Sequence, residues 1–348
     1  MNNNHGFVGI LVANRNQRKY VLQQYLQTNK TNMKLFCFTP HSINWKNKSI
    51  VGLHRSNRKW ALSKFPFPQV VYNRCYDTHQ ELIERLETLI GKDKCFNRIN
   101  QFNKHEVHTN LSRWLFDYLP VTVPFDKENA LHLLEVHKVL YFKPVYGHKG
   151  KGVYRVEMKN SGEIHIGLYY FAPKIILKDS KPFDETIQKL IGSTPYIIQK
   201  GVHIRQLNNK IFDIRALVQK NDKGLWSVTN VVSRIAHKGS YNTSICEKAC
   251  LSVEVLKRLY PPDKVNAIIQ SIYNLSLRSA EIMEENKIHH LGEFSVDFAL
   301  DNDDHIWIIE LNGKPQKDLY DRIRNQFAVY KRPIQYAQYL HTHTDPYR

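Results

Sequence analysis

The sequence of 348 residues lacks the features that mark secreted, membrane-spanning or disordered proteins. It has only five cysteines, an odd number without the spacing of a disulfide framework, so we expect a reducing, cytoplasmic location. No apolar run reaches transmembrane length, and the run from Phe7 to Ala13 is too short for the core of a signal peptide. No low-complexity stretch indicates disorder. We therefore expect a globular chain of two or three lobes without a membrane span.

Acidic residues are scarce relative to basic ones. Lysine and arginine number 50 against 32 aspartates and glutamates, which gives a formal net charge of +18. Such an excess predicts contact with polyanions such as nucleotides or nucleic acids, although a basic surface that only maintains solubility is an equal alternative. No helix-turn-helix, RRM or zinc-finger signature is present, and Cys246 and Cys250 lack the second pair that a structural zinc site needs.

The first hundred residues predict a small α/β domain over residues 1–95. Phe7 to Ala13 is a compact apolar run typical of a buried strand, and Arg18 to Thr28 has helical spacing. The clearest helix is Thr78 to Ile90, with Thr78 as N-cap, Glu81 completing a capping box and Gly91 ending the helix. Two further short strands are expected at Lys34–Phe38 and Val70–Asn73.

Two larger units are expected to follow, over residues 96–198 and 199–348. The first is predicted to contain helices over His105–Leu119 and Pro182–Leu190 and strands over Val121–Pro124, Val139–Pro144, Gly152–Met158, Ile164–Leu168 and Lys174–Leu177. The second is predicted to contain strands over Tyr196–Gln199, Ile211–Gln219, Trp226–Arg234, Phe294–Leu300 and His305–Leu311, a long helix over Pro262–Asn286 and a closing helix over Arg322–Leu340 that Pro333 interrupts.

A glycine-rich basic loop follows the strand that ends near residue 144. Glycines let backbone N–H groups approach phosphate oxygens closely, and lysines neutralise those oxygens. The loop is neither a Walker A motif nor a dinucleotide fingerprint, since a strand rather than a helix is expected to follow it. A basic hairpin loop without a ligand is the alternative. The residues concerned are Lys143, Gly147, Lys149, Gly150, Lys151 and Gly152.

The hairpin near the C-terminus carries three oxygen-bearing side chains. Asp297 and Glu310 straddle its turn almost symmetrically, so we expect them to be cross-strand neighbours about 5 Å apart at Cβ. Asn312 is two residues beyond Glu310 and therefore points to the same face. Two facing carboxylates are costly to bury without a cation, and hard oxygen ligands suit Mg²⁺. The alternative, with both acids in solvent, is disfavoured by the flanking apolar run at residues 307–309.

Two arginines complete the candidate set. Arg215 shares a strand face with Asp213, and Arg234 ends the next predicted strand. Arginines beside a metal site can hold a transferring phosphoryl group and a developing oxyanion. A surface ion pair with no catalytic role is the alternative for either arginine.

In their order and spacing these stretches resemble the ATP-grasp superfamily, and within it the YheC/YheD family, described as endospore coat-associated. The resemblance runs over most of the chain. The stretches that carry it are Phe96-Asn97 with Lys104, Leu119–Thr122, Phe142–Gly152, Ile197–Val202, Phe212–Arg215, Arg234–Ala236 with Asn242, Val296-Asp297 and Glu310–Asn312.

The resemblance implies an α/β (α+β) fold in which an N-terminal pre-ATP-grasp domain precedes two lobes that clasp ATP. It implies that Lys104 and Lys143 contact the ATP phosphates beneath a lid formed by residues 147–152, including Gly147, Lys149, Gly150 and Gly152. It further implies adenine contacts from Gln199, Lys200 and Val202, Mg²⁺ ligation by Asp297, Glu310 and Asn312, and contacts to the γ-phosphate and an acyl phosphate from Arg215, Arg234 and Asn242. The chain departs from the superfamily at Lys200, where an acid is frequent, and at Gln316, where glycine is frequent.

The activity implied is an ATP- and Mg²⁺-dependent ligase that activates a carboxylate as an acyl phosphate and joins it to an amine or similar nucleophile. Its partners would be small-molecule or peptide-like carboxylate and amine substrates. Two alternatives remain open: a non-catalytic nucleotide-binding component of a spore layer, and a basic polyanion-binding protein. The expected location is the cytoplasm or the spore, and the sequence indicates no oligomeric state.

Overall fold

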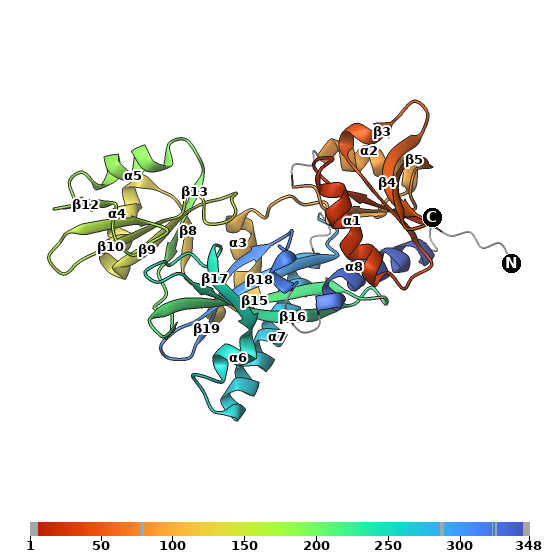
Figure 1. The fold of residues 1–348 in the computed structure, drawn as a ribbon. Helices are drawn as coiled ribbons and strands as arrows, with labels where there is room; N and C mark the ends of the chain where they lie inside the picture. The colour runs from red at the N-terminus through yellow and green to blue at the C-terminus, as the bar shows by residue number, and fades with distance from the viewer. Residues whose placement is uncertain (1–5, 77–79, 286–288, 322, 324–325, 344–348) are drawn as a thin grey trace.

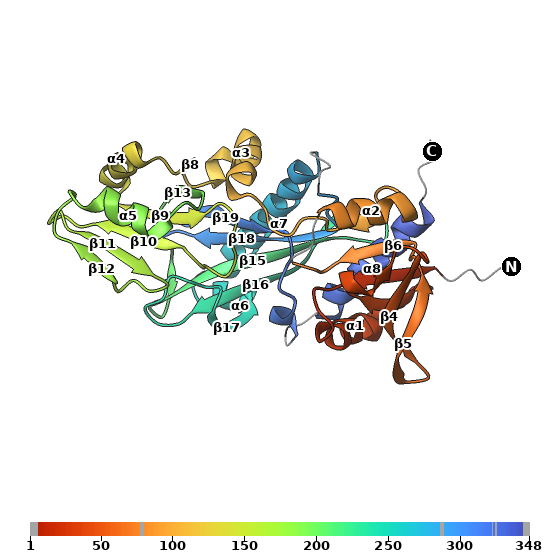
Figure 2. The same cartoon turned by 90° about the horizontal axis from the view of Figure 1, so that it is seen from above.

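The computed structural model describes residues 6–76, 80–285, 289–321, 323 and 326–343. Three β-sheets lie in a row, with the C-terminal lobe between the middle lobe and the N-terminal domain (Figures 1 and 2). Helices pack against each sheet, so the mixed α/β class predicted from the sequence is confirmed. Among the helices of the described residues, none is both long and apolar enough to cross a bilayer.

The N-terminal domain is built around a short parallel sheet whose two faces are both covered. Side chains of β1 alternate between two apolar clusters, with helix α1 in one cluster and α2 in the other. Strand β1 (Phe7–Leu11) pairs in parallel with β2 (Lys34–Phe38) and β6 (Val70–Asn73), and β6 pairs with β7 (Cys95–Phe96). The remaining elements are α1 (Gln17–Thr28), η1 (Pro40–Ser42), β3 (Ile43–Asn44), β4 (Ser49–Ser56), β5 (Lys59–Pro66) and α2 (Gln80–Ile90).

The last helix, α8 (Gln326–Thr342), packs beside α1 on the N-terminal domain (Figure 1). Its buried residues share an apolar cluster with β1 and α1, so the first strand and the last helix belong to one core. Pro333 lies inside the helix without ending it. Gly91 follows α2 with a φ of +102°, which confirms the predicted helix end. The predicted N-cap Thr78 and the predicted helix start at Arg322 lie outside the described residues.

The middle lobe is an antiparallel sheet covered by helices α4 (Lys127–His137) and α5 (Phe183–Ile191). The sequence did not predict α4, in which the Asp126 carboxylate caps the first turn by accepting a hydrogen bond from the Glu128 backbone N–H. In sheet order the strands are β12 (Ile175–Leu177), β11 (Ile164–Leu168), β10 (Tyr154–Met158), β9 (Val139–Pro144), β13 (Tyr196–Lys200) and β8 (Thr122–Pro124).

The C-terminal lobe supplies a long antiparallel sheet whose strand β18 is buried along its whole length. One face of β18 packs on helices α3 (Lys104–Leu115) and α7 (Pro262–Glu285) through Phe294, Val296 and Phe298, while the odd-numbered residues face the opposite side. In sheet order the strands are β17 (Cys246–Leu251), β16 (Trp226–Ala236), β15 (Lys210–Lys220), β18 (Glu293–Leu300) and β19 (Ile306–Asn312). The short strand β14 (Gln206–Leu207) pairs with β15. The remaining helices of the fold are α6 (Ser252–Leu256), η2 (Phe116–Tyr118) and η3 (Asp318–Tyr320).

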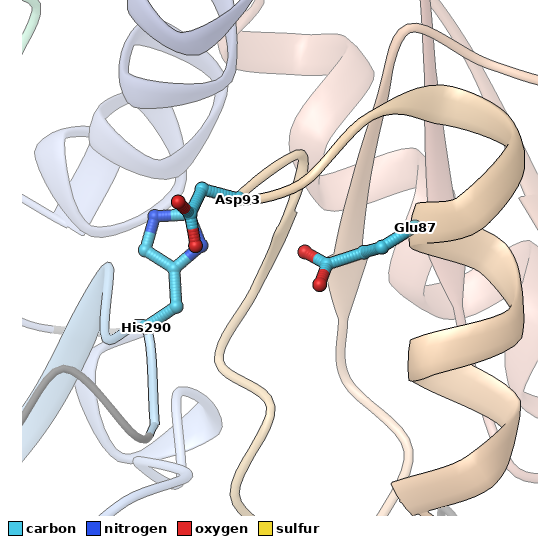
Figure 3. Close-up of side chains that lie close together, drawn as sticks. All are labelled: Glu87, Asp93 and His290. Atoms are coloured by element: carbon cyan, nitrogen blue, oxygen red, sulfur yellow. The ribbon is translucent and has the colours of Figure 1, made fainter.

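An acid and histidine cluster joins the N-terminal domain to the C-terminal lobe. Figure 3 shows the carboxylate of Asp93 beside the ring of His290 and the carboxylate of Glu87 pointing toward both, with possible ligand atoms within 4.8 Å of one another. A single Arg98 nitrogen lies 2.8 Å from both carboxylates. The two His290 nitrogens lie 2.9 Å from the Cys95 carbonyl oxygen and the Tyr336 hydroxyl. Because Arg98 supplies the positive charge and both ring nitrogens have partners, this cluster is a junction rather than a metal site.

Low pH should lower the stability that this junction contributes to the folded protein. Burial, with the nearby cations Arg98 and Lys220, lowers the pKa of His290 to about 4. The unfolded chain, with an ordinary histidine pKa near 6.5, then binds more protons than the folded chain between about pH 4 and 6.5, so stability falls as pH falls through that window. We expect the His290 contribution to be lower by about 2 kcal/mol at about pH 5 than at pH 7. Urea unfolding at both pH values measures it.

His290→Gln is the matched control, because an amide can still pair with a carbonyl and a hydroxyl but does not titrate. Its free energy of unfolding should depend less on pH than that of the unmodified protein. An equal loss of stability in both proteins would contradict the assignment of this pH dependence to His290.

Candidate active site

A cavity of about 130 Å³ lies between the middle lobe and the C-terminal lobe. Most of the side chains and glycines singled out from the sequence line it, although they come from α3, β9, β13, β16, β18, β19 and the loops between them. The predicted residues on its wall are Lys104, Lys143, Gly147, Gly150, Lys151, Gln199, Lys200, Val202, Asp213, Arg234, Asn242, Asp297 and Glu310. The other four, Lys149, Gly152, Arg215 and Asn312, lie behind this wall or on the edge of the glycine-rich loop.

The predicted hairpin brings its three oxygen-bearing side chains together. Asp297 of β18 is the direct cross-strand partner of Glu310 of β19, as the sequence predicted. The Asn312 amide donates to an Asp297 oxygen over 3.3 Å. Glu310 keeps a side-chain exposure of 28 % and lines the cavity, so the acids share one face but differ in access to solvent.

Asp297 is almost fully buried between two arginines. The Arg215 guanidinium donates from Nε and Nη2 to the two carboxylate oxygens, each over 2.6 Å, and Arg234 donates to the second oxygen over 2.9 Å. Burial alone would raise the pKa of Asp297, but the two guanidinium groups outweigh it and lower that pKa to about 2. The carboxylate is therefore ionised at any physiological pH. Asp213 holds Arg234 from the other side.

The donor set fits Mg²⁺, with one rearrangement. A carboxylate offers about four lone-pair sites, and Asp297 already accepts four hydrogen bonds, from Arg215 twice, Arg234 and Asn312. The Asn312 contact is the longest of these. Rotating the Asn312 amide would free one Asp297 lone pair and turn the amide oxygen toward the same position. Asp297, Glu310 and Asn312 would then be the oxygen ligands.

Two lysines form the cationic wall opposite the hairpin. Lys104, at the first turn of α3, lies 3.2 Å from a Glu310 oxygen, and its ammonium donates to the Gly147 carbonyl over 3.2 Å. Lys143, in β9, donates to the Gln199 side-chain oxygen. Burial, reinforced by Lys104, lowers the pKa of Lys143 to about 8, although Glu310 and Asp297 oppose the shift. These cations surround the space beside Glu310 and suit an anion with several negative charges.

The glycine-rich loop closes one side of the cavity and contacts the segment after β16. Gly150 has a φ of +68°, and a Cβ atom there would lie 2.7 Å from the Asn242 amide nitrogen. Asn242 also donates weakly to the Lys149 carbonyl over 3.5 Å. Gly152, at φ +70°, accepts a hydrogen bond from the Tyr196 hydroxyl on its carbonyl. The loop therefore needs glycine both for its backbone conformation and for its approach to Asn242.

The sequence did not predict the apolar part of the wall. Tyr141 and Tyr241 meet edge to face with centroids 5.4 Å apart, and aliphatic side chains of Ile204 and Ile211 lie nearby in the lining. A wall of aromatic and aliphatic side chains can pack against the flat ring of a ligand that lies beside the segment Gln199–Val202. These residues carry no sequence signal of binding, since Tyr141 and Ile211 lie in ordinary predicted strands and Ile204 and Tyr241 in connecting segments. Only their common position in the fold reveals them.

The sequence model of the family described as YheC/D like ATP-grasp matches residues 92–340. The chain is 26 % identical over 325 residues to the endospore coat-associated protein YheD of Bacillus subtilis (strain 168), covering 88 % of this chain and 70 % of that protein. It is 22 % identical over 329 residues to the endospore coat-associated protein YheC of the same strain, covering 87 % of each.

Solved structures share the fold at low sequence identity. D-alanyl-alanine synthetase A from Vibrio cholerae O1 biovar eltor str. N16961 has a TM-score of 0.58 and 12 % identity, covering 97 % of this chain and 99 % of that one. Carboxyaminoimidazole ribonucleotide synthase from Aspergillus clavatus, solved with ATP, has a TM-score of 0.59 and 13 % identity, covering 99 % and 78 %. These similarities confirm the predicted ATP-grasp fold.

The two acids of the hairpin should contribute very differently to stability. Asp297→Asn leaves the buried Arg215 without a charge partner, while Arg234 keeps Asp213, and we expect this to lower the free energy of unfolding by about 3 kcal/mol. Glu310→Gln removes a partly exposed pair with Lys104 and should cost less than about 1 kcal/mol. Urea denaturation without nucleotide measures both. Asp303→Asn, an exposed change in the turn of the same hairpin, is the control. Equal costs for Asp297→Asn and Glu310→Gln would contradict the described contacts of Asp297.

Proposed function

This chain belongs to the YheC/D-like ATP-grasp family, and we propose that it is a Mg²⁺- and ATP-dependent ligase that activates a carboxylate as an acyl phosphate and joins it to an amine or similar nucleophile. The observation that carries the proposal is that Asp297 and Glu310 line a cavity, with Asn312 bonded to Asp297 behind its wall, and that two lysines and the glycine-rich loop line the same cavity. The fold shared with ATP-dependent ligases supports the same conclusion.

The proposed reaction has two steps, formation of the acyl phosphate and its displacement by the amine. A carboxylate oxygen of the first substrate attacks the γ-phosphorus of ATP, the bond between that phosphorus and the ADP oxygen breaks, and ADP leaves. The amine of the second substrate then attacks the acyl carbon, the bond to the phosphate oxygen breaks, and inorganic phosphate leaves while the nitrogen loses a proton. No serine or cysteine nucleophile is required.

The charged groups of the site have different roles in the proposed reaction. Lys104 and Lys143 hold the phosphate chain, and the loop that contains Gly150 excludes water from it. Mg²⁺, when bound, neutralises negative charge on the phosphate oxygens. Arg215 and Arg234 keep Asp297 ionised and oriented, and they offset the negative charge that develops on the transferring phosphoryl group.

The aromatic and aliphatic wall supports binding of the nucleotide base. Gln199 hydrogen-bonds to Lys143 on one side and to the Thr122 hydroxyl on the other, so the start of the segment Gln199–Val202 is fixed between two strands. Lys200 lines the cavity from an exposed position. We assign adenine to this end of the cavity and the triphosphate to the end with Lys104.

The direct test is release of ADP and phosphate from Mg-ATP in the presence of pooled carboxylates and amines. We expect turnover that requires Mg²⁺ and both substrate classes, and that chelation of the metal abolishes. Glu310→Gln should lower turnover by at least about a hundredfold, because it removes a charged group placed at the phosphates, while leaving the protein folded.

Asp303→Asn is the matched control and should keep full turnover, since it neutralises an acid of the same hairpin away from the cavity. Full activity of Glu310→Gln would end the metal assignment. Tight Mg-ATP binding without any turnover across the pool would favour the second candidate, a nucleotide-binding component of the spore coat, which only the names of the two Bacillus relatives support.

Nucleotide affinity should fall at alkaline pH. Because the pKa of Lys143 is lowered to about 8, this lysine loses its charge between about pH 7 and 9, and with it an attraction for phosphate. We expect roughly tenfold weaker ATP binding at about pH 9 than at pH 7. Lys143→Arg stays charged over this range and should lose most of that pH dependence. Calorimetric titration of both proteins measures it; an identical pH profile would exclude Lys143 as the cause.

A further inference from the structure

The N-terminal domain is strongly basic because its sequence lacks acids. No aspartate or glutamate occurs in the first 76 residues, where an even spread of the 32 acids would place about seven. The same stretch holds twelve lysines and arginines, so it accounts for 12 of the 18 net positive charges of the chain. A surface that only maintains solubility needs no such exclusion of acids, since interspersed charges of both signs serve that purpose. The exclusion therefore indicates an anionic partner for this domain.

The hairpin of β4 and β5 lies at the end of the molecule remote from the middle lobe (Figures 1 and 2). One of its faces packs on the domain core, where Ile50 is buried and the Phe65 ring stacks on Phe36 with centroids 4.4 Å apart. Side chains alternate along a strand, so the residues between these point to the other side. In cross-strand register they form three pairs, which we call the hairpin face: Val51 with Lys64, Leu53 with Leu62, and Arg55 with Trp60.

Apolar side chains of the hairpin face are open to solvent. Leu62 and Val51 keep 57 % and 46 % of their surface exposed, and Leu53 and Trp60 are half-buried. Leu62 is the direct partner of Leu53 and a diagonal neighbour of Val51, so the three aliphatic side chains lie next to one another. Contiguous exposed apolar groups beside charged ones mark an interaction surface, because burial against an apolar partner is favourable.

Cations surround these apolar groups. Arg55 and Lys64 lie at opposite ends of the hairpin face, and both are exposed. Arg55 and Lys19 of α1 lie over the Trp60 ring, 5.9 and 6.0 Å from its centroid. Within the first 76 residues the described structure shows an ion pair for Arg74 alone, so none of these three cations is neutralised by a carboxylate of the described chain. They are available to an anionic partner.

These features favour a lipid bilayer with anionic headgroups over a nucleic acid. A single-stranded nucleic acid is held by cations and by bases that stack on open aromatic rings. The hairpin face has one aromatic ring, which two cations already cover in part, and its most exposed apolar side chains are aliphatic and cannot stack. At a bilayer, aliphatic groups enter the boundary between headgroups and acyl chains, tryptophan is common at that depth, and lysines and arginines reach the lipid phosphates.

We propose that the hairpin face docks on an anionic bilayer surface: its aliphatic side chains enter the interface, and Arg55, Lys64 and Lys19 bind lipid phosphates. None of these residues lines the active-site cavity, so the membrane contact is separate from the proposed ligase reaction. That cavity lies between the other two lobes, so docking at this end of the molecule leaves it uncovered.

Co-sedimentation with lipid vesicles in the absence of nucleotide tests the proposal. We expect binding to vesicles made of equal parts of phosphatidylcholine and phosphatidylglycerol, weaker binding as salt is added, and little binding to vesicles of phosphatidylcholine alone. Each cation near an anionic surface strengthens binding about fivefold, so the double variant Arg55→Gln with Lys64→Gln should bind about twentyfold more weakly. Leu62→Ser should bind roughly threefold more weakly or worse, because it removes buried apolar area from the complex.

Strand β12 of the middle lobe provides matched controls. Lys174→Gln with Lys178→Gln removes two exposed lysines, and so the same charge, at the two ends of this strand. Ile176→Ser removes an aliphatic side chain that is 53 % exposed, close to the exposure of Leu62. Both control variants should bind the mixed vesicles as tightly as the unmodified protein.

No binding to the mixed vesicles, equal binding to neutral vesicles, or an equal loss of binding in the β12 variants would overturn the proposal. So would binding of a single-stranded oligonucleotide, lost in the double variant at Arg55 and Lys64, by a protein that does not bind vesicles; that result would assign the hairpin face to nucleic acid. Since no ATP is present, failure of vesicle binding does not count against the ligase proposal, and failure of turnover does not count against the docking surface.

Discussion

The charge balance around Asp297 is the constraint on which the nucleotide site depends. Two arginines and an acid cannot be buried separately, because each charge removed from water costs several kcal/mol unless a partner offsets it. Here Asp297 satisfies Arg215 and part of Arg234, and Asp213 satisfies the rest. The cluster therefore fixes the side chains that face the cavity before any ligand arrives. This preorganisation is what electrostatic stabilisation of a transferring group requires.

Strand β18 carries a second buried and paired acid, Glu293, close to the N-terminal domain. Residues Glu293, Ser295 and Asp297 alternate with the apolar side chains that pack on α7, so the strand has one apolar and one polar face, both buried. Each acid on the polar face is paired with cations from other elements: Asp297 from β15 and β16, Glu293 from the segments after β6 and β19. A single strand thus connects the ion cluster at the active-site cavity to the ion cluster at the N-terminal domain.

The sequence predicted those parts of the molecule in which a local sequence pattern is compatible with only one local structure. The hairpin with Asp297 and Glu310 was predictable because a short turn sets the register, and the glycine-rich loop because glycine spacing is visible in the chain. The hairpin of β4 and β5 was not predicted, since Asn57 and Arg58 make its turn at positive φ without glycine. The packing of α8 on α1, the tyrosine wall and the Lys317–Glu293 pair depend on contacts between distant segments, which no local pattern encodes.

The segment after β19 connects the active-site cavity to the N-terminal domain. It starts at Asn312, whose amide must turn if Asp297 is to accept a metal, and five residues later it places Lys317 against Glu293. Between these points Lys314 and Pro315 hydrogen-bond through their carbonyls to Tyr76 and Arg74 of the N-terminal domain. The segment is therefore bonded to the N-terminal domain at several points, and the Asn312 side chain can rotate without breaking those bonds. If a divalent metal binds at the hairpin, as proposed above, the rearrangement that it requires is confined to the Asn312 side chain, because the segment beyond Asn312 is bonded to the N-terminal domain.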